Sequence, residues 1–388
     1  MSKNKPVVTF VLFYVISYIA YSFTVTQQVS FLTDLGYNTS ERSLILAFMA
    51  AVVILFQILL GYLSDRYATV KRFVLLGLAG YAISAFFNYN MVSRNLLLHL
   101  LLFGLTGGFY MTCYDSSDTW LMETGKDTSR YYSLIRGMGS VGWAIGSLIT
   151  AAIISRFQYG GIGYATLLCV GILLLLSNSI PDAIKNKNSA SKLNLGNIRE
   201  IFASKKYTLT LLVFFLIFCI NALNTVTIVD KMNNLGATNG DLGMKWAIQA
   251  VVELPVFFGG VWLSKYLSMY LMAAIAAVFY VIEFFLFFIV QDVGVLVWLS
   301  LFQMITFPLM LLSAKNLFFD LSPAHLKSTG QMVAFSVANG LTALLIPLYH
   351  SLITTRFGVD ITLLSGVFFG IAALVLLPFA AKSKERNV

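Results

Sequence analysis

The sequence predicts an all-α integral membrane protein whose twelve transmembrane helices form two six-helix bundles. Three observations support this fold class. Of the 388 residues, 58% are hydrophobic and 11% are charged, with a mean hydropathy of +0.81, whereas about a quarter of a soluble domain is charged. The chain contains twelve apolar runs of about 20 residues, the length that crosses a bilayer as a helix. A polar segment separates the first six runs from the last six.

The apolar runs are interpreted as helices because backbone groups in lipid must find their hydrogen-bond partners within the segment. The first run is too long for the apolar core of a signal peptide and no small-residue cleavage site follows it, so it counts as a span. In chain order, the expected spans cover residues 9–30, 43–62, 73–90, 96–118, 134–155, 161–180, 208–229, 246–264, 269–290, 293–314, 329–350 and 361–381. Residues 1–180 then form an N-terminal bundle, 181–207 a cytoplasmic central loop and 208–388 a C-terminal bundle, the layout of transporters built from two related halves.

The distribution of lysine and arginine orients the chain. With the N-terminus inside, the cytoplasmic segments hold three times as many of these residues as the external segments. We therefore expect a multi-pass protein of the cell (inner) membrane with both termini in the cytoplasm. This bias accounts for the net charge of +9. Because the basic residues are spread over short loops, nucleic-acid binding is not expected.

Neither the cysteines nor the histidines have the spacing of a metal site, so no metal and no cofactor are expected. Cys113, Cys169 and Cys219 all fall within spans, where we expect them to serve packing. The three histidines, His350 among them, lie at span ends or next to loops. No H-E-x-x-H or G-x-S-x-G motif indicates an intramembrane hydrolase, so the chain is not expected to be an enzyme.

The loop after the second span reads GYLSDRYATVKR. It resembles the G-x-x-x-D-[RK]-x-G-[RK]-[RK] loop of the major facilitator superfamily, with Gly61, Asp65, Arg66 and Arg72 in or near register. The resemblance implies the major facilitator fold and a gating role for these residues, in which the glycine lets helices approach and the aspartate caps a helix or pairs with an arginine. Ala68 departs from the pattern, because the family usually has glycine there. The alternative is an ordinary positive-inside loop.

The segment SLIRGMGSVGW places Arg136 inside the fifth span. A charge at bilayer depth costs at least about 2.5 kcal/mol, so it normally faces a partner or a water-filled cavity. Asp118, eighteen residues earlier, is the expected partner, and Trp143 lies two helical turns further on. This arrangement, with the Phe-Gln pair in FQILLGYLSDR, resembles the lactose permease and oligosaccharide:proton symporter group. The resemblance implies that Asp118 and Arg136 bind sugar hydroxyls and that Trp143 stacks on the sugar ring.

Three further residues are candidates for the same binding site. Ser140 follows Arg136 by one turn, and Tyr114 and Asp115 precede Asp118 at helical spacing, which suits a polar cavity wall. Two alternatives remain open. The ion pair could serve only to lock the fourth helix to the fifth, and Asp115 could simply meet water at a helix end.

The resemblance also implies proton coupling in the C-terminal half, through a histidine and a glutamate of the tenth helix and an arginine of the ninth. Here Gln303 stands at the position of the histidine, Thr306 at that of the glutamate and Glu283 at that of the arginine. The residues that form the proton relay of the family are therefore not present at these positions. Glu253 and Glu283 are the remaining carboxylates in the spans of this half, and a carboxyl in apolar surroundings is suited to take up and release protons. Each could instead be a protonated structural residue that hydrogen-bonds a neighbouring helix.

The sequence therefore predicts a secondary active transporter that works by alternating access. The expected activity is proton-coupled uptake of a sugar or a related polyhydroxylated solute such as a nucleoside, by a monomer in the lipid bilayer. A carrier that exports sugars or drugs and an uncoupled facilitator are the alternatives among transporters. A sensor that binds sugar without moving it is the alternative outside them.

Overall fold

The computed structural model describes residues 5–183, 195–323 and 326–382. Within these residues all regular secondary structure is helical. Twelve segments of the described chain are long and apolar enough to cross a membrane. The predicted all-α fold with twelve spans is therefore confirmed.

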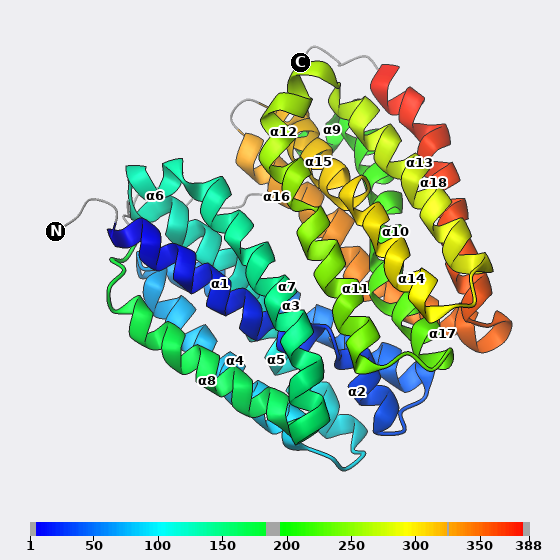
Figure 1. Cartoon of the computed structure of the whole chain (residues 1–388). Helices are drawn as coiled ribbons and strands as arrows, with labels where there is room; N and C mark the ends of the chain where they lie inside the picture. The colour runs from blue at the N-terminus through cyan, green and yellow to red at the C-terminus, as the bar shows by residue number, and fades with distance from the viewer. Residues whose placement is uncertain (1–4, 184–194, 324–325, 383–388) are drawn as a thin grey trace. The chain divides into compact units, whose positions relative to one another are not determined.

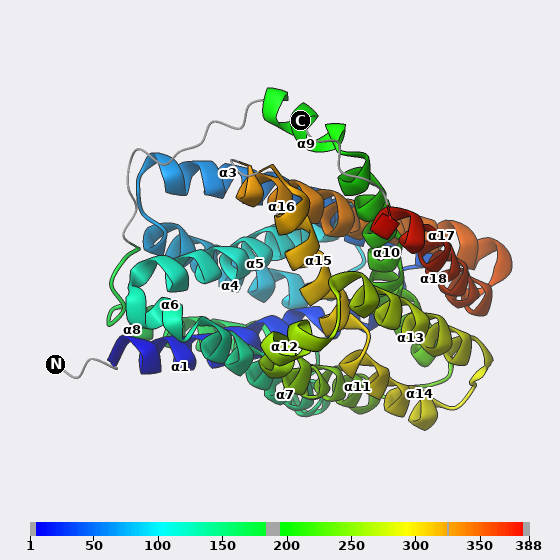
Figure 2. The ribbon, with the colours of Figure 1, turned by 90° about the horizontal axis from the view of Figure 1, so that it is seen from above.

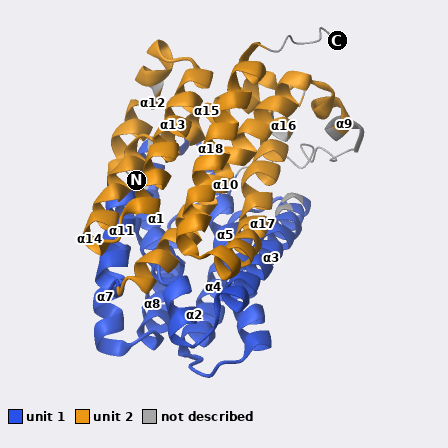
Figure 3. Cartoon of the chain, turned by 90° about the vertical axis from the view of Figure 1, so that its right-hand side faces the viewer, with its two compact units in different colours: residues 1–191, 237–251 blue, residues 192–236, 252–388 orange. Residues whose placement is uncertain are grey.

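The first of two compact units consists of residues 1–191 and 237–251 and is blue in Figure 3. Its helices are α1 (Lys5–Val25), α2 (Gln28–Asp34), α3 (Thr39–Arg66), α4 (Lys71–Asn90), α5 (Leu96–Thr124), α6 (Lys126–Arg130), α7 (Tyr132–Phe157), α8 (Gly160–Ser177) and all but the last residue of α11 (Asn239–Val252).

Helices α1 and α7 of this unit pack along each other (Figure 1). Glycines of α7 make their approach possible. A Cβ at Gly142 would collide with the Val15 backbone, and one at Gly139 would lie 2.9 Å from the Tyr18 ring. Because small residues let membrane helices come close, these glycines allow the face of α1 that carries Tyr18 to pack against α7. Helix α5 packs on α3 and α4, and α8 packs on α1 and α4.

The second unit consists of residues 192–236 and 252–388 and is orange in Figure 3. Its elements are α9 (Leu195–Ala203), α10 (Lys205–Asn234), α12 (Leu254–Tyr266), α13 (Met269–Ile289), α14 (Val293–Leu299), the 3-10 helix η1 (Ser300–Met304), α15 (Phe307–Leu321), α16 (Lys327–Phe335), the π-helix η2 (Ser336–Gly340), α17 (Leu341–Phe357) and α18 (Val359–Lys382). Helix α10 packs against α17 and α18, which also contact each other (Figure 2).

Two expected spans of the second half are interrupted, each just before a proline. The eighth span breaks at Glu253, between α11 and α12, with Pro255 in the first turn of α12. The tenth span continues from α14 through η1 into α15, with Pro308 in its first turn. Proline lacks the N–H that would bond the preceding turn and clashes with its carbonyl, but it fits a first helical turn. The two interruptions contain Glu253 and Gln303.

The eighth span also bears on the predicted division into bundles. Its first part, α11, belongs to the first unit, where Ala247 and Ala250 cluster with Ala144 and Trp143 of α7. The predicted boundaries at 180 and 208 remain a prediction, and most of the expected central loop lies outside the described residues.

Candidate functional site

Asp118 of α5 and Arg136 of α7 are brought together in the first unit. The Asp118 Oδ2 lies 3.6 Å from the Arg136 Nε, and the two side chains are 25% and 27% exposed. The carboxylate also accepts hydrogen bonds from the Tyr14 hydroxyl, at 2.7 Å, and from the Tyr132 hydroxyl, at 2.9 Å. Each charge therefore has a counter-charge and further hydrogen bonds, as an ion pair in a membrane requires. Its partial exposure leaves it accessible to a solute.

Two tyrosine rings lie against the Arg136 guanidinium. Its Nη2 donates a hydrogen bond to the Tyr114 hydroxyl. The guanidinium carbon lies 4.9 Å from the centre of the Tyr114 ring and 5.0 Å from that of Tyr18. Two aromatic faces attract the cation through their quadrupoles. The planar guanidinium thus lies against two neighbouring rings, whose centres are 5.2 Å apart, and its N–H groups point in several directions, a geometry suited to binding hydroxyl oxygens.

The tyrosines of α1 were missed as candidate site residues. Tyr14, Tyr18 and Tyr21 are spaced by four and three residues, so they share one helical face. Tyr14 stacks on Tyr18 with ring centres 6.0 Å apart, and Tyr21 meets Tyr110 of α5 at 4.8 Å. The signal was present as the periodic tyrosines in YVISYIAY. Only the packing of α1 against α7 shows that this face adjoins Arg136.

The other predicted binding residues have different surroundings. Trp143 packs on the aromatic core of the unit and on the alanine cluster shared with α11. Ser140 is partly exposed on α7. Asp115 accepts a hydrogen bond from Gln57 Nε2 of α3, at 2.5 Å. Asp115 is thus directed to α3, whereas Asp118 contacts α1 and α7.

The predicted gating loop follows α3. Gly61 and Asp65 lie in the last turns of α3, and the structure describes their backbone but not the surroundings of their side chains. Arg66 and Arg72 are exposed. Ala68 has a φ of +50°, in the left-handed region that alanine rarely adopts. Glycine adopts this φ without strain, which gives a physical reason for the glycine that the family usually has at this position.

Asp182, which the sequence analysis did not single out, caps the N-terminus of α4. Its carboxylate accepts hydrogen bonds from the Thr69 hydroxyl and from the backbone N–H groups of Val70, Lys71 and Ala183. Burial raises the pKa of this carboxyl, but the hydrogen bonds outweigh burial and hold the pKa below its usual value. A carboxylate at a helix N-terminus is also favoured by the helix dipole. Asp182 therefore anchors the end of the loop.

In the second unit, both proton-coupling candidates contact amide side chains. Glu253, at the break before α12, accepts a hydrogen bond of 2.8 Å from Gln303 Nε2 in η1. Glu283 of α13 is fully buried, with its Oε1 3.5 Å from Asn224 Nδ2 of α10. Gln303 thus contacts the carboxyl at the broken eighth span, a contact that no local pattern in the sequence indicated.

Lys245 is a further candidate functional residue that the sequence analysis missed. It was placed just outside the expected eighth span, but it lies in α11 and is fully buried. Its Nζ donates to Gln249 Oε1, at 3.1 Å, and lies 3.8 Å from the centre of the Trp246 ring. A buried intramembrane cation is a candidate functional residue on physical grounds.

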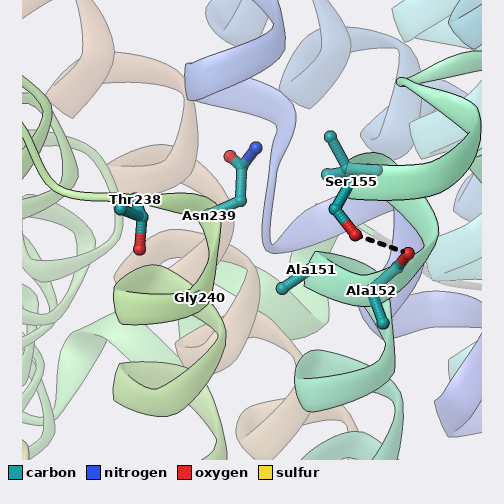
Figure 4. A pocket seen from close by; sticks show the side chains of 7 residues that line it. Ala151, Ala152, Ser155, Thr238, Asn239 and Gly240 are labelled. Atoms are coloured by element: carbon teal, nitrogen blue, oxygen red, sulfur yellow. Dashed lines mark hydrogen bonds between the residues drawn. The ribbon is translucent and has the colours of Figure 1, made fainter.

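A pocket of about 450 Å³ lies at the C-terminal end of α7 (Figure 4). It is lined by Ala151, Ala152, Ile154, Ser155, Thr238, Asn239 and Gly240. None of these lining residues is charged. At 1.5 Å per residue, it lies about 22 Å along α7 from Arg136. The pocket is therefore separate from the Asp118–Arg136 pair.

The fold is similar to solved transporter structures over nearly its whole length. The nucleoside transporter NupG matches with a TM-score of 0.82 at 14% identity, covering 98% of this chain and 100% of that chain. A bacterial homologue of the human lysosomal transporter Spinster has a TM-score of 0.76 at 12% identity, covering 99% and 98%. A POT family transporter in complex with 5-aminolevulinic acid has a TM-score of 0.72 at 12% identity, covering 98% and 95%. Identities this low show a shared fold.

No curated protein matches the sequence. The model of the MFS_1 like family, however, matches residues 7–349, which is most of the chain. The predicted relationship to the major facilitator superfamily is thereby confirmed. With its twelve spans and a fold shared with transporters, the chain is an MFS-type transporter and belongs to the MFS_1 like family.

Proposed function

We propose that the chain takes up a sugar or a related polyhydroxylated solute together with protons, by alternating access. The observation that carries this proposal is the partly exposed Asp118–Arg136 pair in contact with tyrosines. A carboxylate accepts hydrogen bonds from hydroxyls, and a guanidinium donates them in a fixed planar geometry. Aromatic faces such as that of Trp143 suit the apolar C–H side of a sugar ring. The site thus offers the groups that a polyhydroxylated ring needs.

Coupling to protons is assigned to Glu253, with Glu283 as the second candidate. When ionised, the Glu253 carboxylate accepts a hydrogen bond from Gln303, and when protonated it can still use its carbonyl oxygen as the acceptor. Both states therefore keep this contact. Interrupted helices at the site of coupling are a recurring feature of secondary transporters. Efflux and uncoupled transport are the alternatives that the experiment below separates.

A nucleoside is the second candidate substrate. NupG, whose fold is similar, is a nucleoside transporter. The tyrosine rings beside Arg136 would stack on a base as well as on a sugar, and the ribose hydroxyls would meet Asp118 and Arg136. This candidate keeps the same site residues and changes only which part of the solute contacts the rings.

The test uses purified protein in proteoliposomes and a panel of radiolabelled sugars and nucleosides. Uptake above that of empty liposomes, increased by an inwardly directed proton gradient, is the expected result. Uptake that equilibrates without responding to the gradient would indicate a facilitator. Solute transport opposite in direction to the proton gradient would indicate an exporter. The Arg136→Lys protein serves as the matched control for solute binding.

A further inference from the structure

Each oxygen of the Asp118 carboxylate accepts a hydrogen bond from a different tyrosine. Oδ1 accepts from the Tyr14 hydroxyl of α1, at 2.7 Å, and Oδ2 accepts from the Tyr132 hydroxyl of α7, at 2.9 Å. The Arg136 Nε lies 3.6 Å from Oδ2, which is beyond hydrogen-bond distance. The guanidinium therefore supplies the counter-charge of the carboxylate, and the two phenols supply the hydrogen bonds that the structure describes.

The two tyrosines differ in how firmly they are held. Tyr14 is 1% exposed, and its ring centre lies 6.0 Å from that of Tyr18 and 6.4 Å from that of Phe13. Close packing of this kind fixes the position of its hydroxyl. Tyr132 is partly exposed where it packs on the same aromatic core. The Tyr132 hydroxyl can therefore leave the carboxylate by a side-chain rotation, whereas the Tyr14 hydroxyl cannot move without disturbing the core.

The position of Tyr132 in α7 also permits movement. It is the first residue of the helix, one turn before Arg136 and on the same face. The side chain of the N-cap residue, Tyr131, makes no capping hydrogen bond in the described structure. A helix end without a side-chain cap opens at a low free-energy cost. In the predicted orientation, Tyr132 lies one turn closer to the cytoplasm than Arg136.

A solute hydroxyl that binds Asp118 makes the same kind of contact as the Tyr132 hydroxyl. A carboxylate only accepts hydrogen bonds, so the hydroxyl of a sugar or a ribose donates to it, as a phenol does. A carboxylate oxygen has room for about two donors, and Oδ2 already faces the Tyr132 hydroxyl and the Arg136 Nε. The donor on Oδ1 is fixed, whereas the donor on Oδ2 can move. A solute that contacts both charges therefore meets the Tyr132 hydroxyl at Oδ2.

We propose that Tyr132 is an affinity-determining residue whose hydroxyl competes with the transported solute for Asp118 Oδ2, and that Tyr14 positions the same carboxylate through Oδ1. The inference rests on the proposed function, since it requires a hydroxylated solute at Asp118. Return of the Tyr132 hydroxyl to Oδ2 assists release of the solute toward the cytoplasm. The two tyrosines thus have opposite effects on affinity, although each provides one hydroxyl to one carboxylate.

The test removes one hydroxyl at a time and measures solute binding by isothermal titration. Tyr132→Phe removes the competitor, so affinity should rise about three- to tenfold. Tyr14→Phe leaves Oδ1 without its donor, so affinity should fall by about the same factor. Tyr131→Phe is the matched control, because its side chain is 40% exposed, and it should bind like wild type. Equal or weaker binding by folded Tyr132→Phe would refute the competition.

Transport in proteoliposomes gives a second readout. In Tyr132→Phe the KM of solute uptake should fall, and the maximal rate should also fall severalfold because the solute leaves Oδ2 more slowly. A protein that is merely less stable loses maximal rate without a lower KM. A lower maximal rate with an unchanged KM would therefore refute the inference.

Thermal unfolding without solute separates this inference from the proposed function. Tyr14→Phe should lower the melting temperature more than Tyr132→Phe, because water replaces a lost hydroxyl at a partly exposed position but not at a buried one. Equal losses would refute the distinction between a fixed and a movable donor.

The outcomes distinguish the two proposals. If wild type binds the solute and Arg136→Lys weakens this binding, but Tyr132→Phe does not strengthen it, only the inference fails. If wild type binds no sugar or nucleoside, the proposed function fails, and the melting temperatures still decide whether Tyr132 is the movable donor. Should Tyr14→Phe not fold, its buried hydroxyl is the fixed donor, and Tyr132→Phe with its control decides the competition.

Discussion

Replacing Arg136 by lysine tests whether the ion pair binds the solute. The guanidinium places Nε near Asp118 and Nη2 on the Tyr114 hydroxyl, so separate arms of one planar group serve the two contacts. The remaining N–H groups are available for a solute. A lysine ammonium is a single point on a flexible chain. It cannot hold Asp118 and Tyr114 and also bind a solute in the same directions.

The magnitude follows from the contact that the solute loses. A hydrogen bond to a charged group contributes about 1.5–3 kcal/mol. Since 1.4 kcal/mol corresponds to a factor of ten, losing about 1.5–3 kcal/mol weakens binding about 10- to 150-fold. The positive charge is kept, so the Asp118 carboxylate retains a counter-charge and the protein should remain folded in the membrane.

The assay is isothermal titration of purified protein with the solute identified by the uptake panel. Arg130→Lys is the matched control, because Arg130 is exposed on α6 and its guanidinium carbon lies 5.9 Å from the Tyr131 ring. It should bind like wild type. Unchanged affinity in a folded Arg136→Lys protein would mean that the pair only holds α5 to α7.

Four further predictions test other parts of the structure. Glu253→Gln mimics the protonated carboxyl, so exchange of the solute across the membrane of proteoliposomes should persist while its uphill accumulation is lost. Continued accumulation would shift the proton-coupling assignment to Glu283. Gly142→Ala introduces a clash with the backbone of α1 and should destabilise the protein by about 1–3 kcal/mol, measured as a lower melting temperature. In the control Gly171→Ala, the added methyl group meets open space within α8, so the melting temperature should rise slightly. Ala68→Gly relieves a left-handed φ and should stabilise the protein by up to about 1 kcal/mol in thermal unfolding. The pKa of the Asp182 carboxyl is lowered in the folded protein, so its ionised form contributes stability above the unfolded-state pKa, and this stability is lost as the pH falls through the folded-state pKa. The melting temperatures of wild type and Asp182→Asn should therefore converge in acid. A constant difference at every pH would refute this.

The spans were predictable from the sequence because crossing a bilayer imposes length and apolarity on each helix separately. The interruptions also had local causes, since Pro255 and Pro308 end one helical turn and begin another. Arg136 was detectable for a similar reason. A charge inside an apolar run requires a partner, and the opposite charge of Asp118 lies only eighteen residues earlier, at the end of the preceding span.

The partners of the other polar groups could not be predicted in this way. Tyr18 adjoins Arg136 because glycines of α7 let α1 approach, and Gln303 reaches Glu253 because two interrupted helices meet within the second unit. Tyr14 and Asp118 are 104 residues apart, and neither has a local pattern that indicates the other. The sequence by itself determined which segments enter the membrane, because each helix satisfies its own backbone. Only the tertiary structure decided which charges and rings meet, because those contacts depend on how separate helices pack.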